Sequence, residues 1–573
     1  MGAIVLNPGF IPILAALLVL AAPTTARPPI MAISAVIGVS LLLGREYGVE
    51  TEVANIGVPI VLLKLDPLNS IVGIGMLIAL VLIAIYSNAR RNRYEDAAIL
   101  LLAGGAVSAL FVGDWVSFVA AASLAGLAAA WVVFVSPVEN ASRAGARLLI
   151  WHGLEGLLFL VGVGFHVSGG PDNSLLLPLK IEAPRILTAE AFGNAFIFAA
   201  LMIRVGAPLA HVWLKDMVSH ASSAGGVALS VFTTMLGVYA LARIFPAEPL
   251  LVPVGAAMIA IGCFFAAGED DLRRAAAYGM TAQAGVCVAL IGVGSPLALA
   301  AAEGHAFTAM FAFALLQMTL GGVLQRLGDV RLSRFGGLAR AMPVTSALMF
   351  VGGLAAAGAP LLSPYISLSV AYEAVAQWET RALWVMIAAC SAALFVSLAL
   401  RPALAANQPS STSPRLNEAP FTMLLGAIVA AFFCVAVGLA PGWLYGLLPT
   451  ALDFTPYMFD RVAAQFELLG SAGVAYLILR FLRVAPKERE GRVLDVDAFY
   501  RGPMAAAGRW VGVVMLRLYG TWQAGVDRTS ARTGAALAAW TKSLDRPYLS
   551  RVASAAQLAA IAIVIAIIFV ARR

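Results

Sequence analysis

Residues 203–216 read IRVGAPLAHVWLKD, and they place ionisable side chains around a proline within an otherwise apolar segment. Arg204, His211 and Lys215 recur at roughly helical spacing on both sides of Pro208. Proline breaks or kinks a helix because it lacks an N–H donor and clashes with the preceding turn. A break frees backbone carbonyl groups and leaves room for water, which a chain of proton carriers needs. The segment therefore predicts a discontinuous helix near Pro208 that carries a buried polar site.

The letters GAPL recur at residues 358–361, where they interrupt a second apolar run. Paired breaks at corresponding places in two halves of a chain are typical of inverted repeats with discontinuous helices. A coincidental match in a chain rich in alanine and glycine is the alternative. We predict a second discontinuous helix near Pro360.

The composition indicates a membrane protein. Of 573 residues, 61% are hydrophobic and 12% are charged, whereas a soluble domain has about 25% charged residues. The predicted centres of apolar segments that could span a bilayer lie near residues 14, 37, 77, 104, 124, 157, 200, 232, 257, 285, 312, 350, 390, 432, 473 and 561. The expected fold class is an all-α polytopic membrane protein with about 14–16 transmembrane helices.

The distribution of basic residues gives an orientation. They cluster between spans 3 and 4, 5 and 6, 9 and 10, and 11 and 12, and again after span 15. The positive-inside rule then makes these loops cytoplasmic, in a multi-pass protein of the bacterial inner (plasma) membrane. From about Asp495 to Arg546 the mixture of apolar and basic residues is typical of amphipathic helices on the cytoplasmic surface.

These patterns divide the chain into five expected segments. They are N-terminal transmembrane helices at 1–110, a first inverted repeat at 111–245, a second at 246–400, C-terminal transmembrane helices at 401–485, and a cytoplasmic amphipathic segment with a final transmembrane helix at 486–573.

Several classes of function are disfavoured by the sequence. It has no nucleophile elbow, phosphate loop, zinc-ligand spacing or dinucleotide fingerprint. The four cysteines lie in apolar segments without CxxC spacing. The net charge of +7 comes from short loops rather than from a basic and aromatic patch. We therefore expect no metal, no redox cofactor and no nucleic-acid partner, and a transporter-type protein rather than a classical enzyme.

An ionisable side chain at membrane depth has an unfavourable free energy of insertion, so each one is a candidate for function. The candidates for a proton path are Glu155, Arg204, His211, Lys215, Asp216, His220, His305 and Glu373. Glu155 is either a proton carrier or the ion-pair partner of an arginine. Lys215 and Asp216 are alternatively a solvated pair at a helix mouth. His305 is alternatively a hydrogen-bonded residue between helices, and Glu373 an exposed residue at a helix end.

Ordered motifs resemble those of a known family. Residues 270–285 contain DDLRR, AY and QAG at the spacing of the signature of antiporter-like subunits. Residues 208–216 resemble the P-L-H-x-W-L-x-D stretch of that family with Ala210 inserted, and residues 232–243 resemble its F-T-T-K-x-x-V-Y-A-L-x-R stretch. The chain thus resembles the proton-conducting subunits shared by Mrp-type cation/proton antiporters and respiratory complex I, above all the D subunit of Mrp-type sodium/proton antiporters.

This resemblance implies a fold with two inverted five-helix repeats. It also implies a place in a multisubunit antiporter or complex I-like assembly, with other membrane subunits as partners, the lipid bilayer around it, and protons and Na⁺ as candidate ions. In the family, buried lysines pass a proton along the membrane plane, gated by a glutamate–lysine pair, because burial brings the lysine pKa towards neutrality.

This sequence departs from that pattern at the charged positions. The family charges are replaced at Ser123, Met235, Phe313 and Leu368. Arg204 keeps the charge of the seventh-span lysine, but a guanidinium does not release its proton, so it can attract anions or pair with Glu155 and cannot relay. The expected function is a membrane subunit with a degenerate proton path and a partly structural role. The alternative is a subunit that still conducts protons through Glu155, His211, Lys215 and water.

Overall fold

The computed structural model describes residues 6–48, 50–54, 59–87, 92–169, 176–177, 189–378, 380–409, 417–450, 452–484, 495–496, 498 and 500–542. The chain divides into two compact units, Met1–Val493 and Leu494–Arg573. The five segments expected from the sequence stay predictions.

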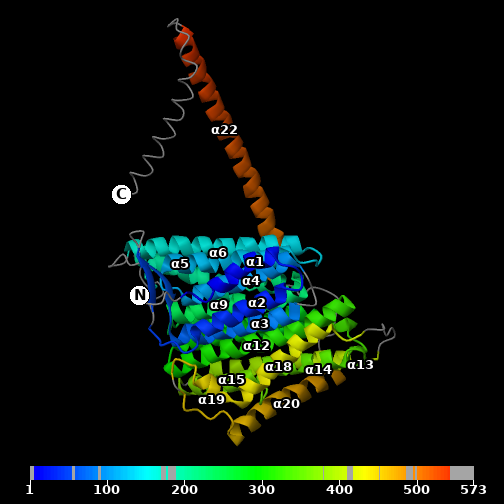
Figure 1. The fold of residues 1–573 in the computed structure, drawn as a ribbon. Coiled ribbons are helices and arrows are strands. Elements are labelled where there is room, and N and C mark those ends of the chain that lie inside the picture. Colours follow the sequence, from blue (N-terminus) through cyan, green and yellow to red (C-terminus); the bar gives the residue numbers. More distant parts are fainter. Residues whose placement is uncertain are drawn as a thin grey trace. The chain divides into compact units, whose positions relative to one another are not determined.

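The first unit is a bundle of helices that run side by side (Figure 1). Its first half contains α1 (Phe10–Ala21), α2 (Arg27–Leu42), α3 (Pro67–Ser87), α4 (Arg93–Phe111), α5 (Trp115–Phe134), α6 (Ala141–Gly169), α7 (Ala189–Val205), α8 (Val212–His220) and α9 (Ser223–Ile244). Its second half contains α10 (Leu251–Gly268), α11 (Leu272–Val293), α12 (Pro296–Leu327), α13 (Leu338–Ala341), α14 (Pro343–Ala356), α15 (Ser363–Gln377), α16 (Arg381–Leu394), a π-helical turn (Phe395–Leu400), α17 (Arg401–Ala406), α18 (Phe421–Leu439), α19 (Pro441–Tyr445) and α20 (Phe459–Phe481).

The helices agree with the spans predicted from the sequence. Within the described residues, 11 helices are long and apolar enough to cross a membrane, and α1, α2, α14 and most of α7 are shorter apolar helices. Every predicted centre from residue 14 to residue 473 falls inside a helix. The predicted span near residue 561 lies outside the described residues. The all-α polytopic membrane class is confirmed, and the inverted repeats stay a prediction.

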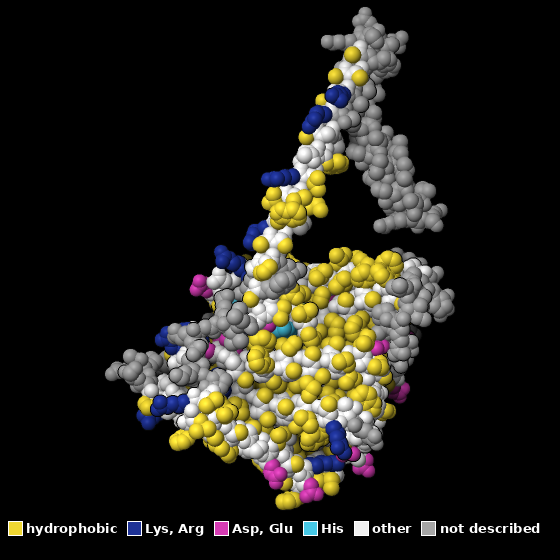
Figure 2. All heavy atoms as spheres, turned by 180° about the vertical axis from the view of Figure 1, so that it is seen from behind, with side chains coloured by type: hydrophobic (Ala, Val, Ile, Leu, Met, Phe, Trp, Pro, Cys, Tyr) yellow, Lys and Arg dark blue, Asp and Glu magenta, His cyan; other side chains and the backbone are white. Residues whose placement is uncertain are grey.

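The burial of the helices separates an interior from a lipid-compatible exterior. The apolar window of α9 is 100% buried, whereas that of α6 is 33% buried and that of α20 is 22% buried. The exposed side chains of α6 include Ile150, Leu154, Leu157 and Leu160. Figure 2 shows hydrophobic side chains spread over one face of this unit, with charged side chains towards its margins. Such an apolar surface is typical of a protein that faces hydrocarbon.

Both predicted breaks are present, and they share one backbone conformation. In the first, the φ angles of Gly206 and Leu209 are 74° and 75°. In the second, the φ angles of Gly358 and Leu361 are 69° and 73°. A leucine rarely adopts this left-handed region, whereas glycine does so readily. A coincidental match of four letters does not account for two turns with the same conformation.

The hydrogen bonds of the two breaks match as well. At the end of α7, the Ala207 amide donates to the Met202 carbonyl at 2.9 Å. At the end of α14, the Ala359 amide donates to the Leu354 carbonyl at 3.0 Å. Bonds of this span are typical of the Schellman motif, which closes a helix with a left-handed residue. Each GAPL segment therefore ends one helix and turns the chain into the next.

A short β-hairpin is the part of the first unit that the sequence did not predict. β1 (Glu50–Ala54) pairs with β2 (Pro59–Lys64) in antiparallel register. The amide of Val61 in β2 donates to the Asp114 carboxylate at 3.0 Å, and the same carboxylate caps α5 by accepting from Ser117 N at 2.8 Å. Asp114 is thus the N-cap of α5, and it also attaches the hairpin to this helix.

The second unit contains α22 (Ala505–Lys542), a helix of 38 residues. Its first half exposes large apolar side chains, among them Trp510, Leu516 and Trp522. Arg509 and Arg517 lie in the same stretch. The stretch expected to be amphipathic therefore forms a π-helical turn (Tyr500–Met504) followed by one long helix.

The left-handed leucines give a test of the breaks by thermal unfolding. A left-handed non-glycine residue costs about 1–2 kcal/mol, and a β-branched residue tolerates positive φ worst. We expect Leu361→Gly to leave the free energy of unfolding unchanged or to raise it by up to about 1 kcal/mol. We expect Leu361→Val to lower it. Intrinsic tryptophan fluorescence of the detergent-solubilised protein follows both variants.

Leu17 in the middle of α1 is the matched control, because it is exposed but helical. In a helix, glycine is less favourable than valine. The order of the glycine and valine variants should therefore reverse between the two positions. The same order at both would contradict the assigned backbone conformation.

Candidate functional site

Polar side chains gather at several places inside the first unit, and three of these contain candidates predicted from the sequence. The triad consists of His152 and Glu155 on α6 and Arg204 in the last turn of α7. The α8 cluster consists of Arg147, Lys215, Asp216 and His220. The His305 network consists of Gln283, His305, Thr308 and Ser367.

The triad is a buried ion pair with a histidine attached. Arg204 Nε donates to Glu155 Oε1 at 2.6 Å, and His152 Nδ1 lies 2.8 Å from Glu155 Oε2. The exposed fractions of His152, Glu155 and Arg204 are 4%, 0% and 2%. A buried pair resists separation because a single charge left in the interior has no solvent to stabilise it.

Neighbouring helices hold the arginine of the triad in place. Arg204 Nη2 donates to the Ala122 carbonyl of α5 at 2.8 Å. Gly237 of α9 packs against the arginine stem, since a Cβ added there would lie 2.9 Å from Arg204 Cγ. Ser123 also faces α6, because its Oγ would lie 3.3 Å from a Cβ added to Gly156. The carboxylate that pairs with Arg204 thus comes from α6, and Ser123 of α5 faces the same helix.

The α8 cluster lies closer to the surface of the bundle. Arg147 of α6 donates to Asp216 Oδ2 at 2.5 Å, and the side chain of Arg147 is 36% exposed. His220 Nδ1 is 2.7 Å from the Asp216 carbonyl oxygen. Lys215 Nζ lies 5.4 Å from the centre of the Tyr278 ring, a distance at which a cation is attracted to the ring face.

Two other groups complete the surroundings of α8. His211 is buried and lies nearly parallel to Phe265, with ring centroids 6.2 Å apart. Burial raises the pKa of Glu269, which follows α10, while the positive charges of Arg274 and Lys215 act in the opposite direction. Lys215 and Asp216 therefore do not form an isolated solvated pair, because both are buried among residues of α6, α10 and α11.

The His305 network joins α11, α12 and α15 beside the second break. His305 Nε2 lies 2.8 Å from Gln283 Oε1, and His305 Nδ1 lies 3.0 Å from Ser367 Oγ. Gln283 Nε2 donates to the Ala356 carbonyl at the end of α14 at 2.6 Å. At the first break, Trp213 Nε1 donates to the Ile203 carbonyl at 2.9 Å. A side-chain donor therefore binds a carbonyl group beside each break.

Three of the four replaced family positions lie in the bundle interior. The exposed fractions of Met235, Phe313 and Leu368 are 1%, 1% and 2%. Phe313 packs beside Gly279 of α11, and Leu368 packs beside Gly358 in the second break. These three side chains point into the protein rather than to lipid.

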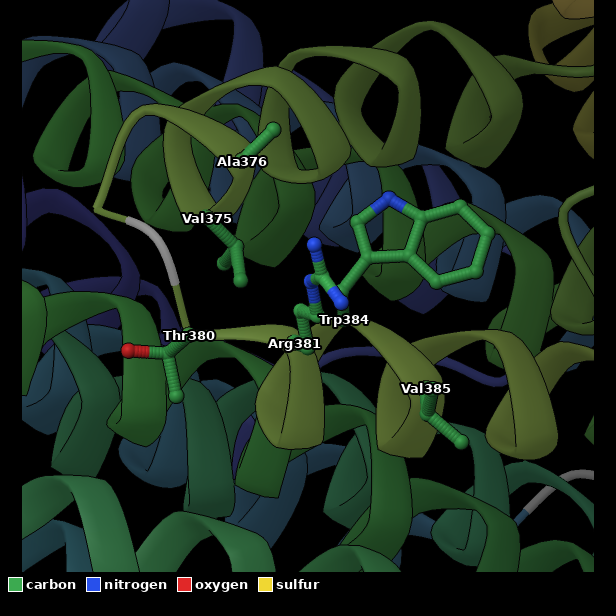
Figure 3. A pocket seen from close by; sticks show the side chains of 6 residues that line it. All are labelled: Val375, Ala376, Thr380, Arg381, Trp384 and Val385. Atoms are coloured by element: carbon green, nitrogen blue, oxygen red, sulfur yellow. The ribbon is translucent and has the colours of Figure 1, made fainter.

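Glu373 is separated from the other candidates. Its carboxylate pairs with Arg461 of α20 at 3.0 Å, and both side chains are about one-third exposed, at 37% and 32%. The nearby pocket has a volume of about 650 Å³ and is lined by Val375, Ala376, Thr380, Arg381, Trp384 and Val385 (Figure 3). None of these residues belongs to the triad, the α8 cluster or the His305 network, so we do not assign the pocket to the polar site.

Some residues of the interior were not predicted from the sequence. His152 shares a helix face with Glu155 at a spacing of three residues, and this spacing could have identified it. Glu303 lies two residues before His305, is 6% exposed, and its Oε2 has no hydrogen-bond partner among the described residues. Gln283 was expected only as part of a motif. No group of three or more metal-ligating side chains occurs within the described residues.

Residues 112–395 match the family described as NADH:quinone oxidoreductase/Mrp antiporter, TM. NADH-quinone oxidoreductase subunit N of Desulforudis audaxviator is 29% identical over 321 residues, which cover 52% of this chain and 63% of that protein. A probable K(+)/H(+) antiporter subunit of Rhizobium meliloti is 26% identical over 304 residues, which cover 48% of this chain and 30% of that protein. The chain thus spans less than two thirds of the length of these relatives.

Two solved structures share the fold of this chain. A chain of the Mrp complex from Dietzia sp. DQ12-45-1b superposes with a TM-score of 0.68 at 18% identity, covering 83% of this chain and 98% of that chain. A chain of respiratory complex I from Thermus thermophilus also gives a TM-score of 0.68 at 18% identity, covering 81% and 100%. Over residues 112–395, this protein is thus similar to the transmembrane family of NADH:quinone oxidoreductases and Mrp antiporters.

Proposed function

We propose that this chain is a membrane subunit of a multisubunit cation/proton antiporter or complex I-like assembly, with a degenerate proton path and a partly structural role. The observation that supports the degenerate path is the burial of Met235, Phe313 and Leu368, each at most 2% exposed. Methionine, phenylalanine and leucine cannot bind or release a proton. A relay that requires titratable groups at these places is therefore interrupted.

The proposed structural role is based on two ion pairs between helices. The Glu155–Arg204 pair ties α5, α6 and α7 together, and the Arg147–Asp216 pair ties α6 to α8. Such pairs preserve the arrangement of helices that neighbouring membrane subunits would contact. Subunits with the full set of exchangeable groups would then carry the protons, and Na⁺ where it is the coupled cation, in a bacterial inner membrane.

A second candidate function is proton conduction through Glu155, His211, Lys215 and water. It is favoured by two buried nitrogens, His152 Nε2 and Arg204 Nη1, that have no hydrogen-bond partner among the described residues. Buried polar atoms of this kind often bind ordered water. Water there would extend the triad towards the α8 cluster.

A variant that removes both charges of the triad distinguishes between the structural and the conducting function. In the double variant Glu155→Gln with Arg204→Gln, two amides can replace the ion pair without leaving an unpaired charge. We expect the reconstituted complex to assemble and to keep its ion flux, and His211→Ala to behave in the same way. Flux is measured in proteoliposomes with a pH-sensitive dye. Lost flux in a fully assembled complex would support the conducting function instead.

The single variant Glu155→Gln should be less stable than that double variant. It leaves the permanent charge of Arg204 buried without a carboxylate, and breaking a buried pair costs about 3–5 kcal/mol. The thermal midpoint of the purified protein measures the difference. Equal midpoints for the single and double variants would show that the pair does not stabilise the bundle.

Restoring one titratable side chain should not restore a proton path. We expect Met235→Lys in this chain to add no flux, because Phe313 and Leu368 remain along the bundle interior. The measurement compares this variant with the parent complex at equal assembly. A gain of proton flux in the single variant would place the path elsewhere.

A further inference from the structure

The charge state of the triad is constrained by its arginine. Arg204 keeps its proton in proteins, and its Nε donates to Glu155 Oε1 at 2.6 Å. This short, charge-assisted bond stabilises Glu155 as an ionised acceptor. An ionised carboxylate has no proton to donate, so it only accepts hydrogen bonds.

This constraint assigns the tautomer of His152. The nitrogen that faces Glu155 Oε2 at 2.8 Å is Nδ1, and it must carry the hydrogen because the carboxylate can only accept. In the neutral ring, Nε2 is then left with a free lone pair. Nε2 is buried and has no hydrogen-bond partner among the described residues. It is therefore the vacant basic position of the triad.

The groups around His152 determine the net charge that the triad carries. Glu155 from the same helix and Arg204 from α7 are the charged groups that act on the ring. On its other sides, α5 contributes Gly126 and α8 contributes Trp213, whose ring centroid lies 5.2 Å away at an edge-on angle. Neither of these titrates. With neutral His152 the two charges of the triad cancel, and with protonated His152 the triad carries one net positive charge.

The ring also lies near the part of the surface where Arg147 is partly exposed, which we call the entrance of the bundle. Arg147, whose side chain is 36% exposed, precedes His152 by five positions on α6. Five helical residues correspond to a rise of about 7.5 Å. Arg147 and Asp216 meet at this end of α8, where the α8 cluster reaches the surface. We expect a proton to reach Nε2 from this part of the surface.

We propose that His152 Nε2 is the proton-binding position of the triad, and that Glu155 and Arg204 keep their charges throughout. On binding, an N–H bond forms at Nε2 and an O–H bond of hydronium breaks, leaving water. On release, the reverse occurs. This inference rests on the proposed function, because a proton taken up here finds no titratable group at Met235 and returns by the way it came. The site thus senses the pH at the entrance without transporting protons.

Infrared difference spectroscopy of the assembled complex in lipid nanodiscs tests this site. Spectra are recorded while the pH is changed across about pH 5–8, where histidines titrate in proteins. We expect imidazole bands that disappear in His152→Gln and persist in His166→Gln, a matched control on the same helix. We expect no change in the carboxyl C=O band that depends on Glu155. Imidazole bands that are the same in His152→Gln as in the unaltered complex, or a carboxyl band lost in Glu155→Gln, would overturn the proposal.

Isotope labelling keeps the test decisive if His152→Gln does not assemble. The chain has five histidines, so ¹³C-labelled histidine identifies their bands in the unaltered complex. We expect the titrating band that we assign to His152 to survive separate substitution of His166, His211, His220 and His305 by glutamine. Its loss in any one of these would assign it elsewhere and refute the proposal. Ion flux of the same samples tests the proposed function independently, because it does not depend on which group gives the bands.

Discussion

The packing of the first half of the bundle depends on burying two opposite charges together. The Glu155–Arg204 pair lies where solvent does not reach, and α5, α6, α7 and α9 all contribute to its surroundings. Because an isolated charge there would be strongly destabilising, the helices that carry these groups have little freedom to move apart. Gly237 and Gly156 allow the close approach that this geometry requires. The first break begins at Gly206, two residues after Arg204, so the pair lies directly beside the turn that ends α7.

The two halves of the bundle share the same turn but differ in the side chains that surround it. Both contain a GAPL turn with the same left-handed residues, and in both a side-chain donor binds a carbonyl group beside the turn. In the first half, the charged side chains of Glu155 and Arg204 lie beside the turn. The second half has a neutral network around His305 and an aliphatic side chain, Leu368, against its turn. The same turn therefore forms beside charged groups in one half and beside uncharged side chains in the other, so its conformation does not depend on neighbouring ions.

The sequence predicted the features that depend on local pattern. Spans follow from long apolar runs, and the breaks follow from Gly206, Pro208 and their counterparts, so these were found with correct positions. The hairpin of β1 and β2 was not predicted, because its strands are short and its attachment through Asp114 joins residues 53 positions apart. The partners of Glu155 depend on tertiary packing, which left its role open between carrier and ion pair. Glu373 pairs with Arg461, a contact between α15 and α20 that no local spacing indicates.

The packing around Leu368 and Phe313 limits the substitutions that the second half of the bundle can accept. Leu368 fills the space beside Gly358, and Phe313 fills the space beside Gly279, where Leu394 and Leu398 also converge. A long cationic side chain at either position would need neighbouring residues to change as well. A proton-binding side chain could therefore be introduced here only together with smaller neighbours on the adjoining helices, and not by one replacement.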